Sequence, residues 1–389
     1  MKRRVYLDNN STTPIDPRVR AAIEPYLNEV FGNPSNLHCF GRDAAEGIAR
    51  AREQVADFLN ARPEEIFFTS GGTEANNWAV KGVAVAQMLE RGRHIVTSPI
   101  EHASILGSVQ YLSEQGWQVT YLPVDSYGVV DPAAVQKALT KQTVLVSVML
   151  ANNEIGTIEP IKEIAAVCKN AGVLFHTDAV AAAGKMKIDV RELGVDLLTI
   201  SGHKIHAPKG VGVLFIREGV KIHPLIHGGH HEKGRRAGTE NIIGIVAMGT
   251  ACTILKNEWQ SHAAKMLLLR RRLEEEILSR VPDVRLNGHP ENRLVNTSHF
   301  SVAYVEGEAL LMNLDLEGIA VASGSACSSG EPEPSPTVKA INIPPLFRNS
   351  VVRFSLGKET TEEDIDYTVA VFERVVKRLR DISPLKGSS

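Results

Sequence analysis

The stretch VDLLTISGHKIHAPKGVGVLF, Val195–Phe215, contains two short apolar runs separated by a polar turn. Leu197–Ile200 and Val211–Ile216 each have the length and composition of a buried β-strand. The turn carries His203 and Lys204. A lysine amine at the end of a buried strand is partly desolvated, and a histidine beside it adds a second potential cation, so both effects favour the neutral amine that forms a Schiff base with an aldehyde cofactor. A lysine in an ordinary surface turn is the alternative.

Further strand candidates alternate with helical segments of ten or more residues along the first two thirds of the chain. This alternation, with short loops, predicts an α/β fold whose mostly parallel seven-stranded sheet is flanked by helices. Ligands of such sheets bind at the carboxyl ends of the strands, so the residues that follow each strand are candidates for a site. The additional strand candidates are Ile66–Thr69, Ile95–Thr97, Val119–Leu122, Val144–Met149 and Val173–His176.

The last third of the chain changes character after Ala251. A charged helix is predicted over Lys256–Arg280, strands over His299–Val302 and Val351–Ser355, and a final helix opens at Thr360-x-x-Glu363, a capping-box spacing. We therefore expect a large domain over 16–255 and a smaller α+β domain over 1–15 and 256–389, which the N-terminal strand joins.

Composition excludes several classes of protein. Of the 389 residues 43% are hydrophobic and 23% charged, and the net charge of −2 gives no electrostatic reason to expect binding to nucleic acid or to an anionic membrane. The basic start MKRR is not followed by an apolar segment, so no signal peptide is expected. The scattered cysteines fit neither a disulfide scaffold nor a metal site, and a reducing cytoplasm is the expected location; they are Cys39, Cys168, Cys252 and Cys327.

The residues that follow the predicted strands each allow a functional and an ordinary interpretation. Ser70–Glu74, with Gly72 and Thr73, suits a phosphate at a helix start, although glycine turns are common there. Asp178 is a carboxylate at a strand end that a pyridinium nitrogen would pair with, or a helix N-cap. His102 can stack on a flat ring or begin a helix, and Asn153 can reach a ring oxygen or cap a turn. Together with Lys204 they supply the parts that hold pyridoxal phosphate.

Cys327 indicates a second chemistry. It lies in ASGSACSSG, a run of small residues with few large side chains to fix it, and we expect a mobile loop over about 322–335. A thiol in such a loop can reach a substrate and then a partner. An incidental loop cysteine is the alternative.

The chain resembles the cysteine desulfurases of the NifS/IscS type, in the class V aminotransferase group of fold-type I enzymes. The matching segments occur in the same order over nearly the whole chain: YLDNNSTTP, FGNPSNLH, FTSGGTEANN, EHASIL, ANNEIGT, FHTDAV, SGHKIHAPKGVG, GRRAGTEN, ASGSACSSG and VRFSLG. The resemblance implies pyridoxal 5'-phosphate as cofactor, L-cysteine as substrate, a homodimer, and a sulfur-acceptor protein such as an iron–sulfur scaffold.

The resemblance also implies a role for each site residue. Lys204 binds the cofactor covalently and moves the substrate's Cα proton, and Cys327 attacks the substrate's sulfur, leaving a persulfide on itself and alanine as product. His102 stacks on the ring and is our candidate for taking the proton of the Cys327 thiol. The remaining cofactor residues are Asp178 at the pyridine nitrogen, Asn153 near the ring oxygen, Gly72, Thr73, Ser201 and His203 at the phosphate, and Thr239 from the other subunit; Asn33 and Arg353 bind the substrate carboxylate.

One departure from the family pattern concerns Ala181, where the family usually has a glutamine that hydrogen-bonds the ring oxygen. A weakened desulfurase is therefore one alternative. A selenocysteine lyase or another class V aminotransferase is a second, although an aminotransferase has no use for a mobile Cys327. A non-catalytic sulfur or cluster carrier is a third, which the joint presence of Lys204, Asp178 and Arg353 disfavours.

Overall fold

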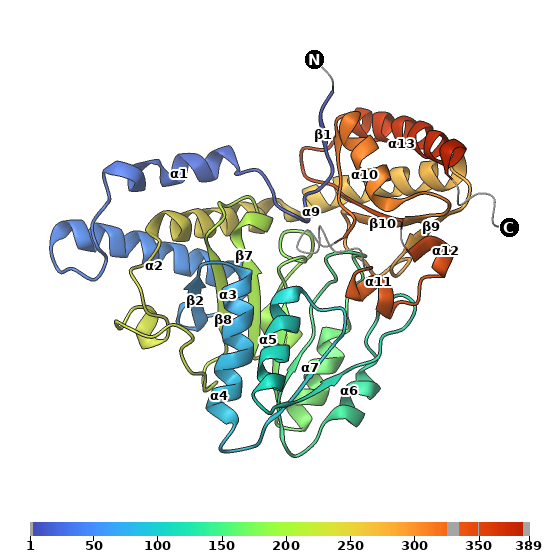
Figure 1. Ribbon diagram of the computed structural model, residues 1–389. Helices are drawn as coiled ribbons and strands as arrows, with labels where there is room; N and C mark the ends of the chain where they lie inside the picture. The colour runs from blue at the N-terminus through green and yellow to red at the C-terminus, as the bar shows by residue number, and fades with distance from the viewer. Residues whose placement is uncertain (1–2, 325–333, 349, 384–389) are drawn as a thin grey trace.

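The computed structural model describes residues 3–324, 334–348 and 350–383, and a large α/β part and a smaller part lie side by side in it (Figure 1). Seven strands of the large part form one sheet in the order β2-β8-β7-β6-β5-β3-β4. Strand β8 runs antiparallel to both β2 and β7, and the other neighbours are parallel. The predicted mostly parallel sheet is confirmed. Its strands are β2 (Ile66–Thr69), β3 (His94–Thr97), β4 (Gln118–Tyr121), β5 (Thr143–Ser147), β6 (Leu174–Asp178), β7 (Leu197–Ser201) and β8 (Gly212–Ile216).

Both faces of this sheet are buried except at the edge strand β4, which explains why the other strands read as continuous apolar runs. Successive side chains of a strand point to opposite faces, so Phe67 and Leu197 pack into one apolar cluster while Phe68 and Leu198 pack into another. The first cluster contains residues of α3 (Gly72–Asn77), a π-helical turn (Trp78–Gly82), α4 (Val83–Gln87) and α5 (Ala103–Glu114). The second contains residues of α1 (Pro17–Asn28), α2 (Cys39–Leu59), α6 (Pro132–Ala138), α7 (Ile161–Asn170), α8 (Val190–Leu193) and α9 (Ile242–Arg280).

The smaller part has its own apolar core. A three-stranded antiparallel sheet in the order β12-β10-β9 packs against helices, and the N-terminal strand β1 pairs in parallel with β11. Val5 and Leu7 belong to this core, so the start of the chain packs with its C-terminal part. The elements are β1 (Val5–Tyr6), β9 (Val284–Asn287), β10 (Thr297–Val302), α10 (Gly307–Leu316), β11 (Ile319–Ala320), α11 (Pro336–Ala340), α12 (Pro345–Arg348), β12 (Val351–Ser355) and α13 (Glu362–Ile382).

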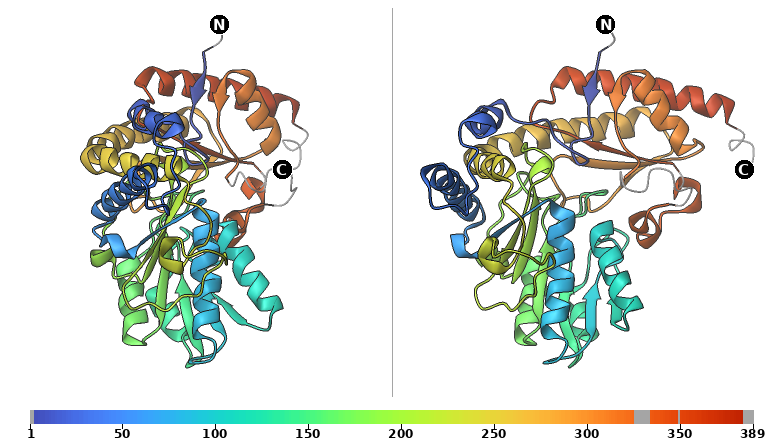
Figure 2. Two further views of the ribbon diagram at one scale, coloured as in Figure 1. Left: turned by 90° about the vertical axis from the view of Figure 1, so that its left-hand side faces the viewer. Right: turned by 60° about the vertical axis from the view of Figure 1, so that its left-hand side comes forward.

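Two predicted boundaries are wrong. The long charged helix begins at Ile242 and not at Lys256, because its apolar first half packs on the large sheet and its second half on the small core. Helix α9 thus runs continuously across both parts (Figure 2). The capping box of the last helix is formed by Thr361 and Asp364, one residue later than predicted.

Among the residues that the structure describes, no helix is both long and apolar enough to cross a membrane.

Candidate active site

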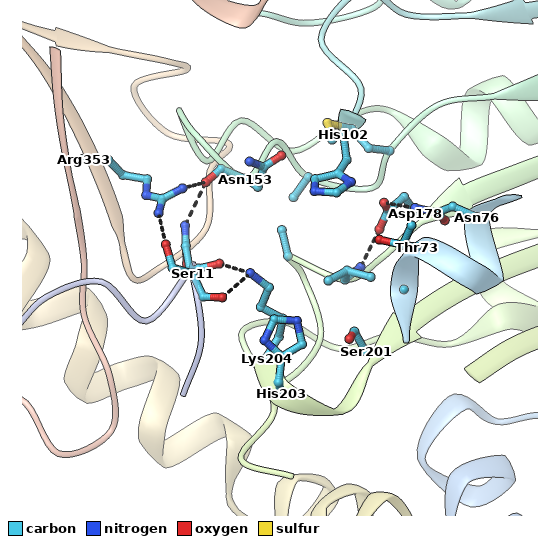
Figure 3. A pocket seen from close by; sticks show the side chains of 16 residues that line it. Ser11, Thr73, Asn76, His102, Asn153, Asp178, Ser201, His203, Lys204 and Arg353 are labelled. Carbon is cyan, nitrogen blue, oxygen red and sulfur yellow. Dashed lines mark hydrogen bonds between the residues drawn. The ribbon is translucent and has the colours of Figure 1, made fainter. Parts of the chain in front are cut away.

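A cavity of about 230 Å³ lies at the carboxyl ends of the sheet strands. Its walls include side chains from the ends of β6 and β7, from the helix starts that follow β2 and β3, and from β12 of the smaller part (Figure 3). Nine of the site residues predicted from the sequence line it together: Gly72, Thr73, His102, Asn153, Asp178, Ser201, His203, Lys204 and Arg353. Ala181 lines it as well.

Lys204 ends a short 3₁₀ turn, Gly202–Lys204, that follows β7 directly. Its Nζ donates hydrogen bonds to the carbonyl oxygens of Asn10 and, at 2.8 Å, Ser11. The N-terminal segment is itself tied to this turn, since Thr13 N–H donates to the carbonyl of His203 at 2.9 Å. The amine therefore lies inside the cavity where the two parts of the protein meet.

Two basic side chains interact electrostatically with Lys204, and only one of them, His203, was expected from the sequence. Burial and the neighbouring Lys204 lower the pKa of His203 to about 4, so His203 is neutral at physiological pH. Lys185, in contrast, is buried, and burial followed by repulsion from Lys204 lowers its pKa to about 7. Sequence reasoning missed Lys185, because nothing in AGKMKID distinguishes a buried lysine from an exposed one.

Asp178 ends β6 and is 5% exposed. Its Oδ2 accepts a hydrogen bond from Asn76 Nδ2 at 2.6 Å and its Oδ1 accepts one from the Val180 N–H at 2.9 Å. Both donors are neutral. A buried carboxylate held only by neutral donors is suited to a cationic nitrogen of a bound ligand.

His102 is the N-cap of α5. Its Nδ1 accepts a hydrogen bond from the Ser104 N–H at 3.1 Å, and a neutral imidazole that accepts at Nδ1 carries its proton on Nε2. Burial is the main cause that lowers the pKa of His102, with Asp178 opposing it and Lys204 adding to it. A neutral ring with Nε2 protonated and Nδ1 accepting has no free lone pair for a further proton. The role of His102 towards the Cys327 thiol stays a prediction.

The turn between β2 and α3 forms the end of the cavity that is suited to a phosphate. Backbone approaches closely here, because a Cβ on Gly212 of β8 would lie 2.5 Å from the carbonyl carbon of Gly71. An adjoining hollow is lined by this turn, Ser201, His203 and Lys209. Backbone N–H groups at a helix start together with hydroxyl and basic side chains form an anion site.

Arg353 of β12 approaches from the smaller part and is 1% exposed. Its Nη2 donates to Asp8 Oδ1 at 2.8 Å and to Ser11 Oγ at 2.9 Å, and its Nη1 donates to the Asn153 carbonyl at 3.0 Å. Three neighbours thus fix the guanidinium at the cavity wall, and a fixed guanidinium is well shaped for a carboxylate.

Comparison with known proteins places this geometry in a family. The family model "Aminotransferase class-V" matches residues 5–368. A cysteine desulfurase IscS of Dictyoglomus turgidum is 51% identical over 386 residues, covering 99% of this chain and 98% of the relative. The chain belongs to the cysteine desulfurases of the class V aminotransferase family.

Other relatives agree along the full length of the desulfurase. Cysteine desulfurase IscS of Methanosarcina thermophila is 48% identical over 381 residues, covering 98% of this chain and 94% of the relative. Among solved structures, a NifS-like protein superposes with a TM-score of 0.91 at 38% identity, covering 97% of this chain and 100% of that one. SspA in complex with cysteine superposes with a TM-score of 0.81 at 32% identity, covering 93% of this chain and 100% of that one.

Desulfurases of this family use pyridoxal phosphate, and the residues of the cavity fit that group. An amine, a buried carboxylate and a flat imidazole face one space, and an anion site adjoins it. The described residues contain no group of three or more potential ligands that could hold a metal ion.

Two predicted site residues lie away from this cavity, and a third is not among the described residues. Asn33 is exposed in the loop between α1 and α2, where its Oδ1 accepts from the Ser35 N–H at 2.9 Å. Thr239 lines a separate hollow beside Arg236. Cys327 lies outside the described residues.

Proposed function

We propose that the protein converts L-cysteine into L-alanine at this cavity and transfers the sulfur, as a persulfide on Cys327, to an acceptor protein for iron–sulfur cluster assembly. The observation that carries the proposal is the convergence of Lys204, Asp178 and Arg353, from three separate regions of the sequence, on one cavity of a full-length member of the desulfurase family.

In this proposal, different cavity residues contact different parts of the cofactor. We assign Asp178 to the pyridine nitrogen, His102 to one face of the ring and Asn153 to the neighbourhood of the ring oxygen. Gly72, Thr73, Ser201 and His203 are assigned to the phosphate. Bound pyridoxal phosphate acts as an electron sink for the bonds at the substrate's Cα.

Lys204 is assigned the covalent attachment of the cofactor and the movement of the Cα proton. The carbonyl oxygens of Asn10 and Ser11 accept hydrogen bonds from Nζ, so they give the amine a defined resting position within the cavity.

Arg353 is assigned to the substrate carboxylate. Asn33 lies away from the cavity in the described chain, and its part in binding the carboxylate stays a prediction. Two N–H groups of the guanidinium, Nε–H and one on Nη1, are not used by the contacts with Asp8, Ser11 and Asn153. The buried Nε has no hydrogen-bond partner among the described residues, which is the expected state of a donor kept for a ligand.

The sulfur step is balanced as a transfer between two sulfur atoms. The Cys327 thiolate forms a bond to the substrate's sulfur, and the substrate's Cβ–S bond breaks with its electron pair left on the carbon side, which is protonated to give alanine. The sum is L-cysteine and a thiol giving L-alanine and a persulfide. The attacking group is a thiolate, because the protonated thiol is a poor nucleophile.

A homodimer is part of the proposal. Large apolar side chains are exposed along α1, α2 and the loop between them: Leu27, Phe31, Leu37 and Phe40. A surface of this kind is suited to burial against a second copy. Thr239, away from its own cavity, would then reach the phosphate of the other subunit. A cytoplasmic location is also proposed.

The experiment that tests the function is incubation of the purified, cofactor-loaded protein with L-cysteine, measuring alanine and protein-bound persulfide. Both should form in equal amounts in the first turnover. Selenocysteine as sole accepted substrate would favour the lyase alternative, and alanine formation that depends on a keto-acid would favour an aminotransferase.

A further inference from the structure

The side chain of Asn76, in α3, lines the cavity beside Asp178 (Figure 3). Its Nδ2 donates to Asp178 Oδ2 at 2.6 Å and to Ser104 Oγ at 2.9 Å. Asn76 is 1% exposed, and its Oδ1 has no hydrogen-bond partner among the described residues. A buried amide that leaves its oxygen unpaired lowers stability, so its position calls for a functional explanation.

The carboxylate of Asp178 decides which way this amide points. An ionised carboxylate only accepts hydrogen bonds, so the NH₂ group of Asn76 must face it. That NH₂ group has two protons, and the second is directed at Ser104 Oγ. The Ser104 hydroxyl therefore accepts from Asn76, and its single proton is free to be donated elsewhere.

The Ser104 proton has an acceptor in His102. Ser104 Oγ lies 2.7 Å from His102 Nδ1, and the Ser104 backbone N–H donates to the same nitrogen at 3.1 Å. Two donors thus point at Nδ1. Protonation of Nδ1 would place its N–H against the backbone N–H of Ser104, which cannot reverse, and would require the Ser104 hydroxyl to stop donating to this nitrogen.

We propose that Asn76 and Ser104 are positioning residues that hold His102 as the neutral tautomer with its proton on Nε2. The proposal rests on the assignment of His102 to the cofactor ring and deepens it. It gives His102 the role of a neutral stacking group that donates a hydrogen bond from Nε2, and assigns acceptance of the Cys327 proton to another group.

The charged groups around His102 do not by themselves determine its protonation state. Asp178 of β6 favours the imidazolium, while Lys204 of the turn after β7 disfavours it, so their effects on the pKa of His102 oppose each other. Burial raises the pKa of the adjacent Glu101 to about 8, which leaves that carboxyl largely protonated at neutral pH, and His203 is neutral. The donors at Nδ1 disfavour both forms of the ring that carry a proton on this nitrogen, the imidazolium and the Nδ1–H tautomer.

The test is ¹⁵N NMR of the His102 ring in the cofactor-loaded protein, with the signal assigned by its loss in His102→Gln. The ring-nitrogen shifts distinguish the two tautomers and the imidazolium directly. We expect the Nε2–H form at neutral pH. In Ser104→Ala one donor at Nδ1 is removed, so the midpoint of His102 protonation should move to higher pH, and Asn76→Ala should move it in the same direction.

Ser108→Ala is the matched control. Ser108 lies one turn further along α5, is buried, and its Oγ donates to the Ser104 carbonyl at 2.7 Å without contacting His102. Its substitution should leave the midpoint unchanged. An Nδ1–H tautomer in the parent protein, or equal midpoints for the parent and Ser104→Ala, would overturn the proposal. Because the NMR readout does not depend on turnover, absence of desulfurase activity would contradict the proposed function and leave this result standing.

Discussion

Replacement of Arg353 by lysine tests how the substrate carboxylate is bound. The guanidinium is held by Asp8, Ser11 and the Asn153 carbonyl, and it retains two N–H donors for a ligand. A lysine keeps the positive charge but has one nitrogen, which cannot reach these neighbours and a carboxylate in the same arrangement.

The size of the effect follows from the hydrogen bond to the carboxylate that a lysine cannot make. A hydrogen bond to a charged group contributes about 1.5–3 kcal/mol, and a lysine can replace one of the two that the guanidinium offers. At about 1.4 kcal/mol for each factor of ten, kcat/KM for L-cysteine should fall roughly 10- to 150-fold. The decrease should appear mainly as a higher KM, since the carboxylate is bound equally before and during the reaction.

The assay is steady-state alanine formation over a range of L-cysteine concentrations, with thermal unfolding measured in parallel. Arg293→Lys is the control, because Arg293 is also a buried arginine of the smaller part but pairs with Glu274 at 2.5 Å and does not line the cavity. Its KM should match that of the parent protein. An unchanged KM in a folded Arg353→Lys protein would refute the assignment.

Four further substitutions test the site and its surroundings. Lys204→Ala should abolish the borohydride-reducible link between protein and cofactor, and survival of that link would make the assignment wrong. Ala181→Gln should supply the missing hydrogen bond to the ring oxygen, shift the pH at which the cofactor's absorption changes and raise activity roughly 10- to 1,000-fold; an unchanged spectrum and rate would show that another group already fills this role. Because burial raises the pKa of Glu101 to about 8, the folded state binds its proton more tightly than the unfolded state, and the free energy of unfolding should fall as the pH rises from about 4.5 towards 8. Glu101→Gln should flatten that slope in denaturant titrations, and an equal slope would contradict the buried, protonated carboxyl. Cys327→Ala should still bind L-cysteine, with the accompanying change in cofactor absorption, but form neither persulfide nor alanine. Substitution of the other cysteines should leave turnover nearly intact: Cys39, Cys168 and Cys252.

The sequence predicted the large sheet well because all of its strands except the edge strand β4 are buried on both faces. Leu197–Ile200 and Ile66–Thr69 are apolar along their length because helices cover both faces of the sheet at these strands. The sequence does not predict the start of α9, because the two halves of this helix have different patterns. The first half is apolar and packs on the large sheet, whereas the second half is charged and packs on the smaller core.

The site was predicted where a residue follows a strand and missed where it does not. Asp178 and Lys204 stand directly after apolar runs, so their position at one edge of the sheet follows from the topology. Asn76 lies within a helix and Lys185 in a loop, and their burial is set by packing that no local pattern shows. The charge state of His203 was misjudged for the same reason, since burial lowers its pKa.

The most direct test of the account is mass spectrometry of the cofactor-loaded protein after a single turnover with L-cysteine. The account predicts one additional sulfur atom on the peptide that contains Cys327 and one alanine released for each sulfur bound. Alanine released without sulfur on that peptide, or a persulfide on Cys39 instead, would contradict it.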